Sequence, residues 1–255
     1  VIVLGFTGIL GKLVSLDAVN LVWYRMLIAF FALALFLAFK KQLFSISIKD
    51  FIGIFGVGCL VAIHWLCFFQ SIKVSTVSVA VLCLATSSLF SAFIEPIFFK
   101  RKLLLYEVIM GLVVIGALSY ILGAEIQYLS GYVYGIIAAF LGTLFTLFNA
   151  KYIDTVDATK ITMIEMLAGV ILVGSLFIFH DLEEIKLPFN IGFIELSTTL
   201  NSLKYPSIND LIYLTILGTL CTAMVFVWMT EIMRHISPFS LIMAINLEPI
   251  YSIIL

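Results

Sequence analysis

The feature that most constrains this chain is a pair of apolar segments that follow one another with almost no break. Residues 51–72 contain one charged or imidazole side chain, His64, and residues 74–99 contain mainly apolar side chains. Lys73 marks the turn between them, and a similar pattern returns over residues 225–255. Because a membrane-spanning helix needs about 20 mainly apolar residues, the pattern predicts consecutive spanning helices.

Composition extends this prediction to the whole chain. Apolar residues make up 63% of the 255 residues, charged residues 11%, and the mean hydropathy is +1.22. A soluble fold could not hide this much apolar surface, so we expect the chain to lie in a lipid bilayer. The net charge of −1 provides no basic surface for nucleic acid, which excludes a nucleic-acid-binding role.

The cysteines give no sign of a metal or disulfide site. All four fall inside apolar runs, and none forms a Cys-x-x-Cys pair. Small packing residues are therefore the expected interpretation, and we expect neither a metal nor a cofactor. The four are Cys59, Cys67, Cys83 and Cys221.

Apolar segments recur along the chain and predict an all-α polytopic membrane protein with about nine helices. Residues 181–208 form the one long polar stretch, expected to be an extramembrane loop with one interfacial helical turn. The last helix begins at Ser237-Pro238, an N-cap followed by a first-turn proline. The expected helices cover residues 1–13, 19–39, 51–72, 74–99, 107–123, 132–150, 161–180, 210–231 and 237–255.

Glycines within the third expected helix form the string G-x-x-G-x-G at Gly53, Gly56 and Gly58. A glycine-rich dinucleotide-binding loop follows a β-strand, and none is predicted here. Small residues let helix backbones approach closely in membranes. We therefore expect close helix packing at these positions.

Basic residues predict the orientation. Loops after the even-numbered helices carry nine Lys and Arg residues, and loops after the odd-numbered helices carry four. Basic loops favour the cytoplasmic side. We therefore expect an inner (plasma) membrane protein with a cytoplasmic N-terminus and with the long acidic loop outside.

The two halves of the chain have related patterns. The sequence around Arg25, WYRMLIA, matches the sequence around Glu165, TMIEMLAG. With five helices per half, the second repeat starts on the opposite side of the membrane from the first, so the repeats are inverted, as in many transporters. We expect repeats over residues 1–125 (helices 1–5) and 126–255 (helices 6–9).

The strings GFTGILGKL, VWYRMLIA, HWLCFFQSIKVSTVSVA and SPFSLIMAINLEPIYSIIL, together with the two-repeat plan, resemble EamA-type permeases of the drug/metabolite transporter superfamily. The Asn-Leu-Glu-Pro string at residues 246–249 is the most specific match. The resemblance implies two inverted five-helix repeats, both termini inside, and a central cavity for metabolites. The family plan has ten helices, so the chain is expected to be a fragment that lacks the tenth.

Glu248 is the strongest candidate for a functional residue, because ionisable groups in a bilayer usually face a cavity or a partner. Pro249 cannot donate to the carbonyl of Ile245, which opens the helix beside the acid. Such a place can bind a cation, an ammonium group or a proton. The alternative is an acid bonded within the bundle at a helix kink.

Other ionisable residues in the expected helices carry the same pair of alternatives. Arg25 could bind a carboxylate, and Glu165 is its repeat mate. Glu231 could line the pathway or lie at the membrane interface. Glu95, beside the kink residue Pro96, is expected to form an ion pair with the basic cluster at residues 100–102.

His64 lies in mid-helix beside aromatic residues and could relay protons, donate within a cavity, or bond a neighbouring helix. Weaker candidates for the substrate or proton pathway share a polar or indole group in an apolar segment. They are Trp65, Gln70, Ser87, Asn246 and Trp228.

Together these features predict a membrane transporter of small organic metabolites. Export of amino acids or related compounds by alternating access around a midplane cavity is the leading hypothesis, from the resemblance. The alternatives are a multidrug or nucleotide-sugar-type carrier, or a membrane enzyme or receptor. No nucleophile–base pair or metal cluster supports an enzyme. A monomer or a homodimer is expected.

Overall fold

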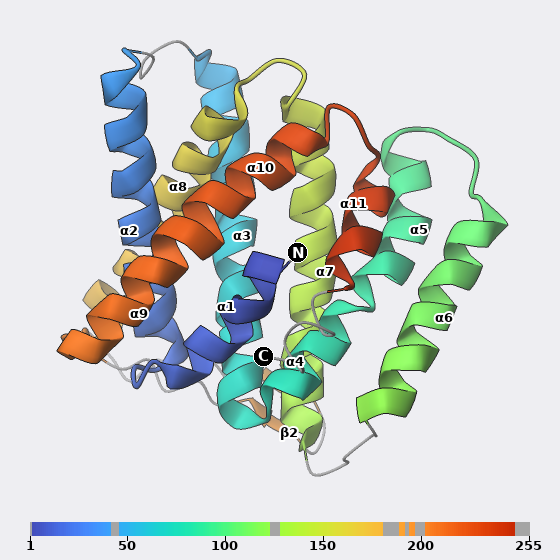
Figure 1. Cartoon of the computed structure of the whole chain (residues 1–255), viewed down its shortest axis with the longest axis horizontal. Coiled ribbons are helices and arrows are strands. Elements are labelled where there is room, and N and C mark those ends of the chain that lie inside the picture. Colours follow the sequence, from blue (N-terminus) through green and yellow to red (C-terminus); the bar gives the residue numbers. More distant parts are fainter. Residues whose placement is uncertain are drawn as a thin grey trace.

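The computed structural model describes residues 2–41, 46–122, 128–180, 189–191, 194–196 and 202–247, and within them the chain is almost entirely helical (Figure 1). The helices are α1 (Ile2–Leu13), α2 (Ala18–Phe39), α3 (Ile48–Val74), α4 (Val77–Leu84), α5 (Ser87–Phe98), α6 (Leu105–Leu122), α7 (Leu129–Tyr152), α8 (Ala158–His180), α9 (Ile208–Gly218), α10 (Val225–Ile232) and α11 (Pro238–Ile245). A π-helix, η2 (Thr219–Met224), joins α9 to α10.

Within the described ranges, six helical segments are long and apolar enough to cross a membrane. They are α2, α3, the α4–α5 pair, α7, α8, and the run from α9 through α10. The apolar helices α1 and α6 are shorter. The prediction of an all-α polytopic membrane protein is confirmed.

Successive spans run in opposite directions, as a serpentine membrane path requires. Helices α2, α5, α7 and α10 end at one end of the bundle, and α1, α3, α6 and α8 end at the other (Figure 1). The even-numbered expected helices therefore all end on one side. The predicted orientation requires this arrangement, because it compares the basic residues of the loops at one end of the bundle with those at the other.

The segment expected as one helix over residues 74–99 is one spanning segment, as predicted, but a break divides it into the helices α4 and α5. The hydroxyls of Thr86, Ser87 and Ser88 donate to carbonyl oxygens three residues earlier, at 2.6, 2.6 and 2.8 Å. Hydroxyls bonded in this way compete with the backbone ladder of a helix. The break therefore lies at this polar cluster, whereas Pro96, expected to bend the helix, lies in the last turn of α5.

The eighth expected helix contains a π-helical stretch that the sequence did not reveal. Thr222 donates its hydroxyl to the carbonyl of Leu217 at 2.6 Å, five residues earlier. At the start of this stretch, a Cβ on Gly218 would lie 2.9 Å from Ile28 of α2. This close approach brings the π-helix against α2 and places Thr222 beside it.

The long polar stretch contains two short strands in its described part, where an interfacial helical turn was expected. β1 (Phe189–Ile191) pairs antiparallel with β2 (Ile194–Leu196), with Asn190 opposite Glu195. Among the described residues, no other strand pairs with this hairpin. The last expected helix begins as predicted, because Ser237 accepts from the backbone N–H of Ser240 at 3.2 Å and Pro238 follows it.

Helix α3 is the centre of the bundle and packs most extensively against α7 and α8. A Cβ on Gly58 would lie 2.6 Å from Cα of Glu165 in α8, and a Cβ on Gly53 would collide with Tyr152 of α7. Gly56, by contrast, faces open space. Close packing is therefore confirmed at two of the three glycines.

Candidate functional site

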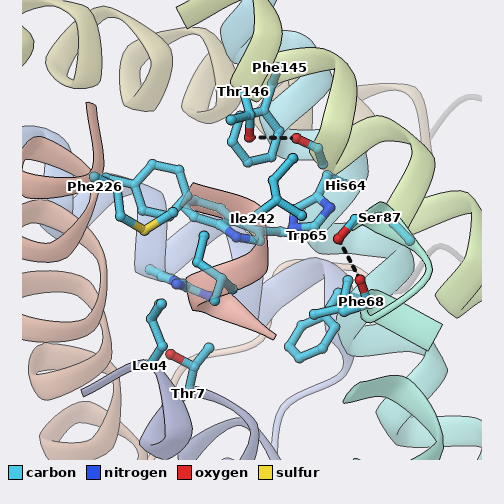
Figure 2. Close-up of a pocket in the computed structure, with 16 residues that line it drawn as sticks. Leu4, Thr7, His64, Trp65, Phe68, Ser87, Phe145, Thr146, Phe226 and Ile242 are labelled. Atoms are coloured by element: carbon cyan, nitrogen blue, oxygen red, sulfur yellow. Dashed lines mark hydrogen bonds between the residues drawn. The ribbon is translucent and has the colours of Figure 1, made fainter. Parts of the chain in front are cut away.

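A cavity of about 90 Å³ lies between the helices, and residues from both halves of the chain line it (Figure 2). Because a buried water needs about 10–15 Å³, the cavity has room for several waters or a small group. Its wall is mainly aromatic and aliphatic, with a few polar groups. The lining residues are Leu4, Thr7, Arg25, His64, Trp65, Phe68, Leu84, Ser87, Ala139, Gly142, Phe145, Thr146, Phe226, Met229, Ile242 and Ile245.

His64 of α3 is held in the cavity wall by one ring nitrogen. Its Nδ1 lies 2.7 Å from the carbonyl oxygen of Ala138 in α7. A carbonyl can only accept, so Nδ1 carries the proton and, in the neutral ring, Nε2 is an acceptor. Nε2 has no partner among the described residues. The imidazole can therefore accept a hydrogen bond or a proton from a molecule in the cavity.

Arg25 of α2 is only 1% exposed and brings a guanidinium into the bundle. Its Cζ lies 4.0 Å from the ring centroid of Trp65 and 5.4 Å from that of Phe69. Its Nε donates to Oγ1 of Thr222 at 2.5 Å. Because the Thr222 hydroxyl hydrogen goes to Leu217, the lone pairs of its oxygen are available to Arg25. The planar cation is thus held by aromatic faces and a hydroxyl, which suits Arg better than Lys.

Aromatic rings join the two halves of the cavity wall. Trp65 of α3 packs edge to face on Phe226 of α10, with ring centroids 4.9 Å apart. Phe226 lies 6.0 Å from Phe145 of α7, which in turn lies 5.2 Å from His64. Figure 2 shows these rings around the same space. The Trp65–Phe226 and His64–Phe145 pairs are edge to face and the Phe226–Phe145 pair is stacked, and such ring pairs give the apolar pocket its shape.

Of the predicted pathway residues, Arg25, His64, Trp65 and Ser87 meet at this cavity. Ser87 reaches it because it opens α5 directly after the break in the helix (Figure 2). The polar cluster that ends α4 therefore also provides a hydroxyl to the wall.

Glu165 of α8 lies away from the cavity lining, although it is fully buried, with 0% exposure. Its Oε1 accepts from Nδ2 of Asn149 in α7 at 2.8 Å. Its backbone lies against Gly58 of α3. The repeat mates Arg25 and Glu165 are thus both in the interior but in different surroundings.

Glu231, Trp228 and Gln70 also lie outside the cavity lining. The carboxylate of Glu231 is about half exposed and pairs with Arg234 at 2.9 Å. Trp228 is 62% exposed on the same helix, α10, and Gln70 is half-buried in α3. These side chains have no direct contact with a molecule held at the cavity in this conformation.

Glu95 of α5 forms the expected ion pair with the basic cluster, and it also bonds the backbone of α11. Arg101 lies 3.2 Å from Glu95 and 2.7 Å from Glu107, and both carboxylates are nearly buried. Burial lowers the pKa of Arg101, but the bonds to Glu107 and the charge of Glu95 outweigh it and raise that pKa. Glu95 also accepts the backbone N–H of Phe239 at 2.8 Å, in the first turn of α11. One carboxylate thus ties the first half of the chain to the second.

The strongest predicted candidate, Glu248, and the neighbouring Pro249 lie outside the described residues. Asn246 directly follows α11, is 8% exposed, and has no described partner for its Nδ2. Two α11 side chains, Ile242 and Ile245, line the cavity. The helix that leads to Glu248 therefore contributes to the site.

Several residues of the site carried little signal in the sequence. Phe145 and Phe226 are two of 23 phenylalanines, most of which are expected to pack or face lipid. Thr222, Thr146 and Asn149, by contrast, are single polar residues within spanning segments, and on that ground the sequence could have pointed to them. In the described part of the chain, no group of three His, Cys, Asp or Glu side chains could hold a metal ion.

Comparison with known proteins adds a family and a fold. The model of the EamA-like transporter family matches residues 1–123. No curated protein matches the chain. Eleven chains of solved structures match it. One crystal structure has a TM-score of 0.72 at 12% sequence identity, over 99% of this chain and 83% of that chain. At this identity the likeness concerns the fold alone.

Proposed function

We propose that this chain, whose residues 1–123 match the model of the EamA-like transporter family, exports amino acids or related small metabolites. In this proposal the protein lies in the plasma membrane with its N-terminal end in the cytoplasm. Residues 1–125 and 126–255 form two inverted repeats. These half-bundles rock about the cavity, which opens to one side of the membrane at a time.

The observation that carries the proposal is a cavity lined by both halves of a membrane bundle, with a cation and an imidazole in an aromatic wall. Ligand sites of transporters lie between repeats near the bilayer midplane. A movement of one half against the other would therefore change every contact in such a site. A rigid pore or a scaffold has no need of this arrangement.

The chemistry of the wall suits an amphipathic molecule with a carboxylate. The positive charge of Arg25 attracts the carboxylate, and the rings of Trp65 and Phe226 pack against an apolar side chain. Nε2 of His64 accepts from a donor of the substrate, such as an ammonium group. Ser87 contributes a hydroxyl oxygen at the same wall.

Glu248 is proposed to bind the ammonium group or a proton, from its place beside Pro249 in the sequence. The helix before it, α11, lines the cavity with Ile242 and Ile245. Together, Glu248 and Arg25 would supply opposite charges to the two ends of an amino acid.

The test compares metabolites in the medium of cells that express the wild-type gene, Glu248→Gln, or the control Glu231→Gln. We expect at least one amino acid or related amine to accumulate outside with the wild type and the control, but not with Glu248→Gln. Membrane insertion of all three, measured on purified membranes, should be equal. Identical media for wild type and empty vector would refute export, and full activity of Glu248→Gln would remove Glu248 from the mechanism.

A further inference from the structure

The buried pair of Glu165 and Asn149 has an unusual hydrogen-bond balance. Asn149 donates one amide hydrogen to Oε1 of Glu165 at 2.8 Å. Two oxygens of the pair, Oε2 of Glu165 and Oδ1 of Asn149, have no donor among the described residues. Both residues are almost completely buried, at 0% and 2% exposure. The pair therefore presents two buried acceptors and lacks a hydrogen to share with them.

An ionised carboxylate fits these surroundings poorly. A buried charge without a charged partner is strongly unfavourable, and a buried acceptor without a donor adds to that cost. None of the ion pairs found among the described residues includes Glu165. Gly58 of α3 packs closely against the backbone of Glu165.

A carboxylic acid fits the same surroundings well. A proton on Oε2 removes the charge and supplies one new O–H donor, while Oε1 still accepts from Asn149. A carboxylic acid can also share two hydrogen bonds with an amide, one in each direction. The missing hydrogen is thus the one that protonation adds.

We propose that Glu165 and Asn149 form a proton-binding site, and that one proton moves inward through it for each substrate molecule exported. The proton adds to Oε2 from water on one side of the membrane and leaves to water on the other side. No other bond forms or breaks. This inference rests on the proposed transport function, because the exchange requires the half-bundles to move.

The site is connected to the cavity along α7. Thr146 lines the cavity, and Asn149 follows it three residues later, on the same face of the helix. Glu165 lies across from Asn149 on α8. A substrate that displaces Thr146 would therefore also disturb the bond that holds Glu165.

Other ionisable groups lie on the helices packed against α8, and they can influence its titration. Helix α2 carries Arg25, held by Trp65 and Thr222, and α3 carries His64 at the cavity and Lys49, Asp50 and Lys73 near its ends. Helix α10 carries Glu231, paired with Arg234, and α7 carries Lys151 near its end. Among the described contacts, only the amide of Asn149 bonds the Glu165 carboxyl.

The first experiment is infrared spectroscopy of the purified protein in lipid, without substrate, during a pH titration. We expect a carbonyl stretch of a protonated carboxylic acid in the wild type at neutral pH. It should be absent in Glu165→Gln and retained in the control Glu231→Gln. In Asn149→Leu the band should shift, because the hydrogen bond to Oε1 is lost. Gln keeps the size and neutral charge of the protonated acid, so that variant should fold. A wild-type spectrum identical to that of Glu165→Gln would overturn the site.

The second experiment measures accumulation of a mixture of proteinogenic amino acids in proteoliposomes with an acidic lumen. With the membrane potential clamped at zero, one proton per substrate predicts that each unit of pH gradient changes the steady-state ratio about tenfold, since one unit corresponds to about 1.36 kcal/mol. Glu165→Gln should show no response to the gradient. A retained response would overturn the coupling. A protonated-acid band without any accumulation would leave the proton site intact and refute the proposed substrate class instead.

Discussion

Arg25 and Glu165 occupy matching positions in the sequence patterns of the two halves, yet the protein buries them in opposite ways. Arg25 is in contact with a hydroxyl and two aromatic faces at the edge of a cavity. The backbone of Glu165 packs against Gly58 of α3, and its carboxyl group bonds only the amide of Asn149 among the described residues. An arginine cannot give up its charge in a protein, whereas a glutamic acid can take up a proton. The comparison teaches that a permanent charge requires an elaborate environment, and a titratable one does not.

The largest effect is expected at the permanent charge. Arg25→Met removes the cation and should abolish transport. Arg25→Lys keeps the charge but loses the planar contact with Trp65, which is worth about 2 kcal/mol when desolvated, or roughly a thirtyfold fall in rate. Export rates normalised to protein in the membrane test both variants. Lys151→Met, at an exposed position of α7, is the matched control. A Lys variant with the wild-type rate would break the comparison, because any cation would then be sufficient.

A smaller effect is expected where α3 covers Glu165. A Cβ at position 58 would lie 2.6 Å from Cα and 2.7 Å from the carbonyl oxygen of Glu165, and neither backbone atom can move alone. Gly58→Ala should therefore lower the free energy of unfolding by about 1–3 kcal/mol, as overpacking generally does. Thermal melting in detergent measures the change.

Gly56→Ala is the control for this experiment, because nothing lies within 4 Å of its added methyl group. Alanine is a better helix former than glycine, by up to about 1 kcal/mol, so this variant should melt at or above the wild-type temperature. Equal melting of the two variants would mean that the contact between α3 and α8 is not tight.

The smallest effect is expected at an acid that is neither buried nor beside the cavity. Glu231→Gln loses an exposed pair with Arg234, which is worth about 0.3–0.5 kcal/mol. Its melting temperature and its export rate should both stay close to those of the wild type. A strong loss of transport would show that burial in this conformation is a poor guide to function, and would return Glu231 to the pathway.

The sequence predicted the helices well, because hydropathy alone specifies a membrane bundle. Helix α2 begins and ends within a residue of the expectation, and the N-cap at Ser237 was read correctly. The break before Ser87 and the π-helix at Thr219–Met224 were missed. Both arise from hydroxyl groups that donate to backbone carbonyls. The spacing of apolar residues in the sequence does not reveal such hydrogen bonds.

The candidate site was predictable only in part. Arg25 and His64 stand out because ionisable groups in apolar segments are rare. Whether such a group faces the cavity or a neighbouring helix depends on which side of its helix it occupies and on the residues opposite. Glu165 faces away from the cavity for that reason, and its partner Asn149 becomes visible only when α7 and α8 are placed side by side.

The π-helix determines which way the side chains of α10 point. Its hydrogen bonds span five residues where an α-helix spans four, so the segment Thr219–Met224 accommodates one residue more than a regular helix would. If the same six residues formed a regular α-helix instead, everything after them would be rotated by about 100°. Phe226 and Met229 would then turn out of the cavity. The second-half wall of the site therefore depends on the π-helical conformation of this stretch as much as on the identity of its residues.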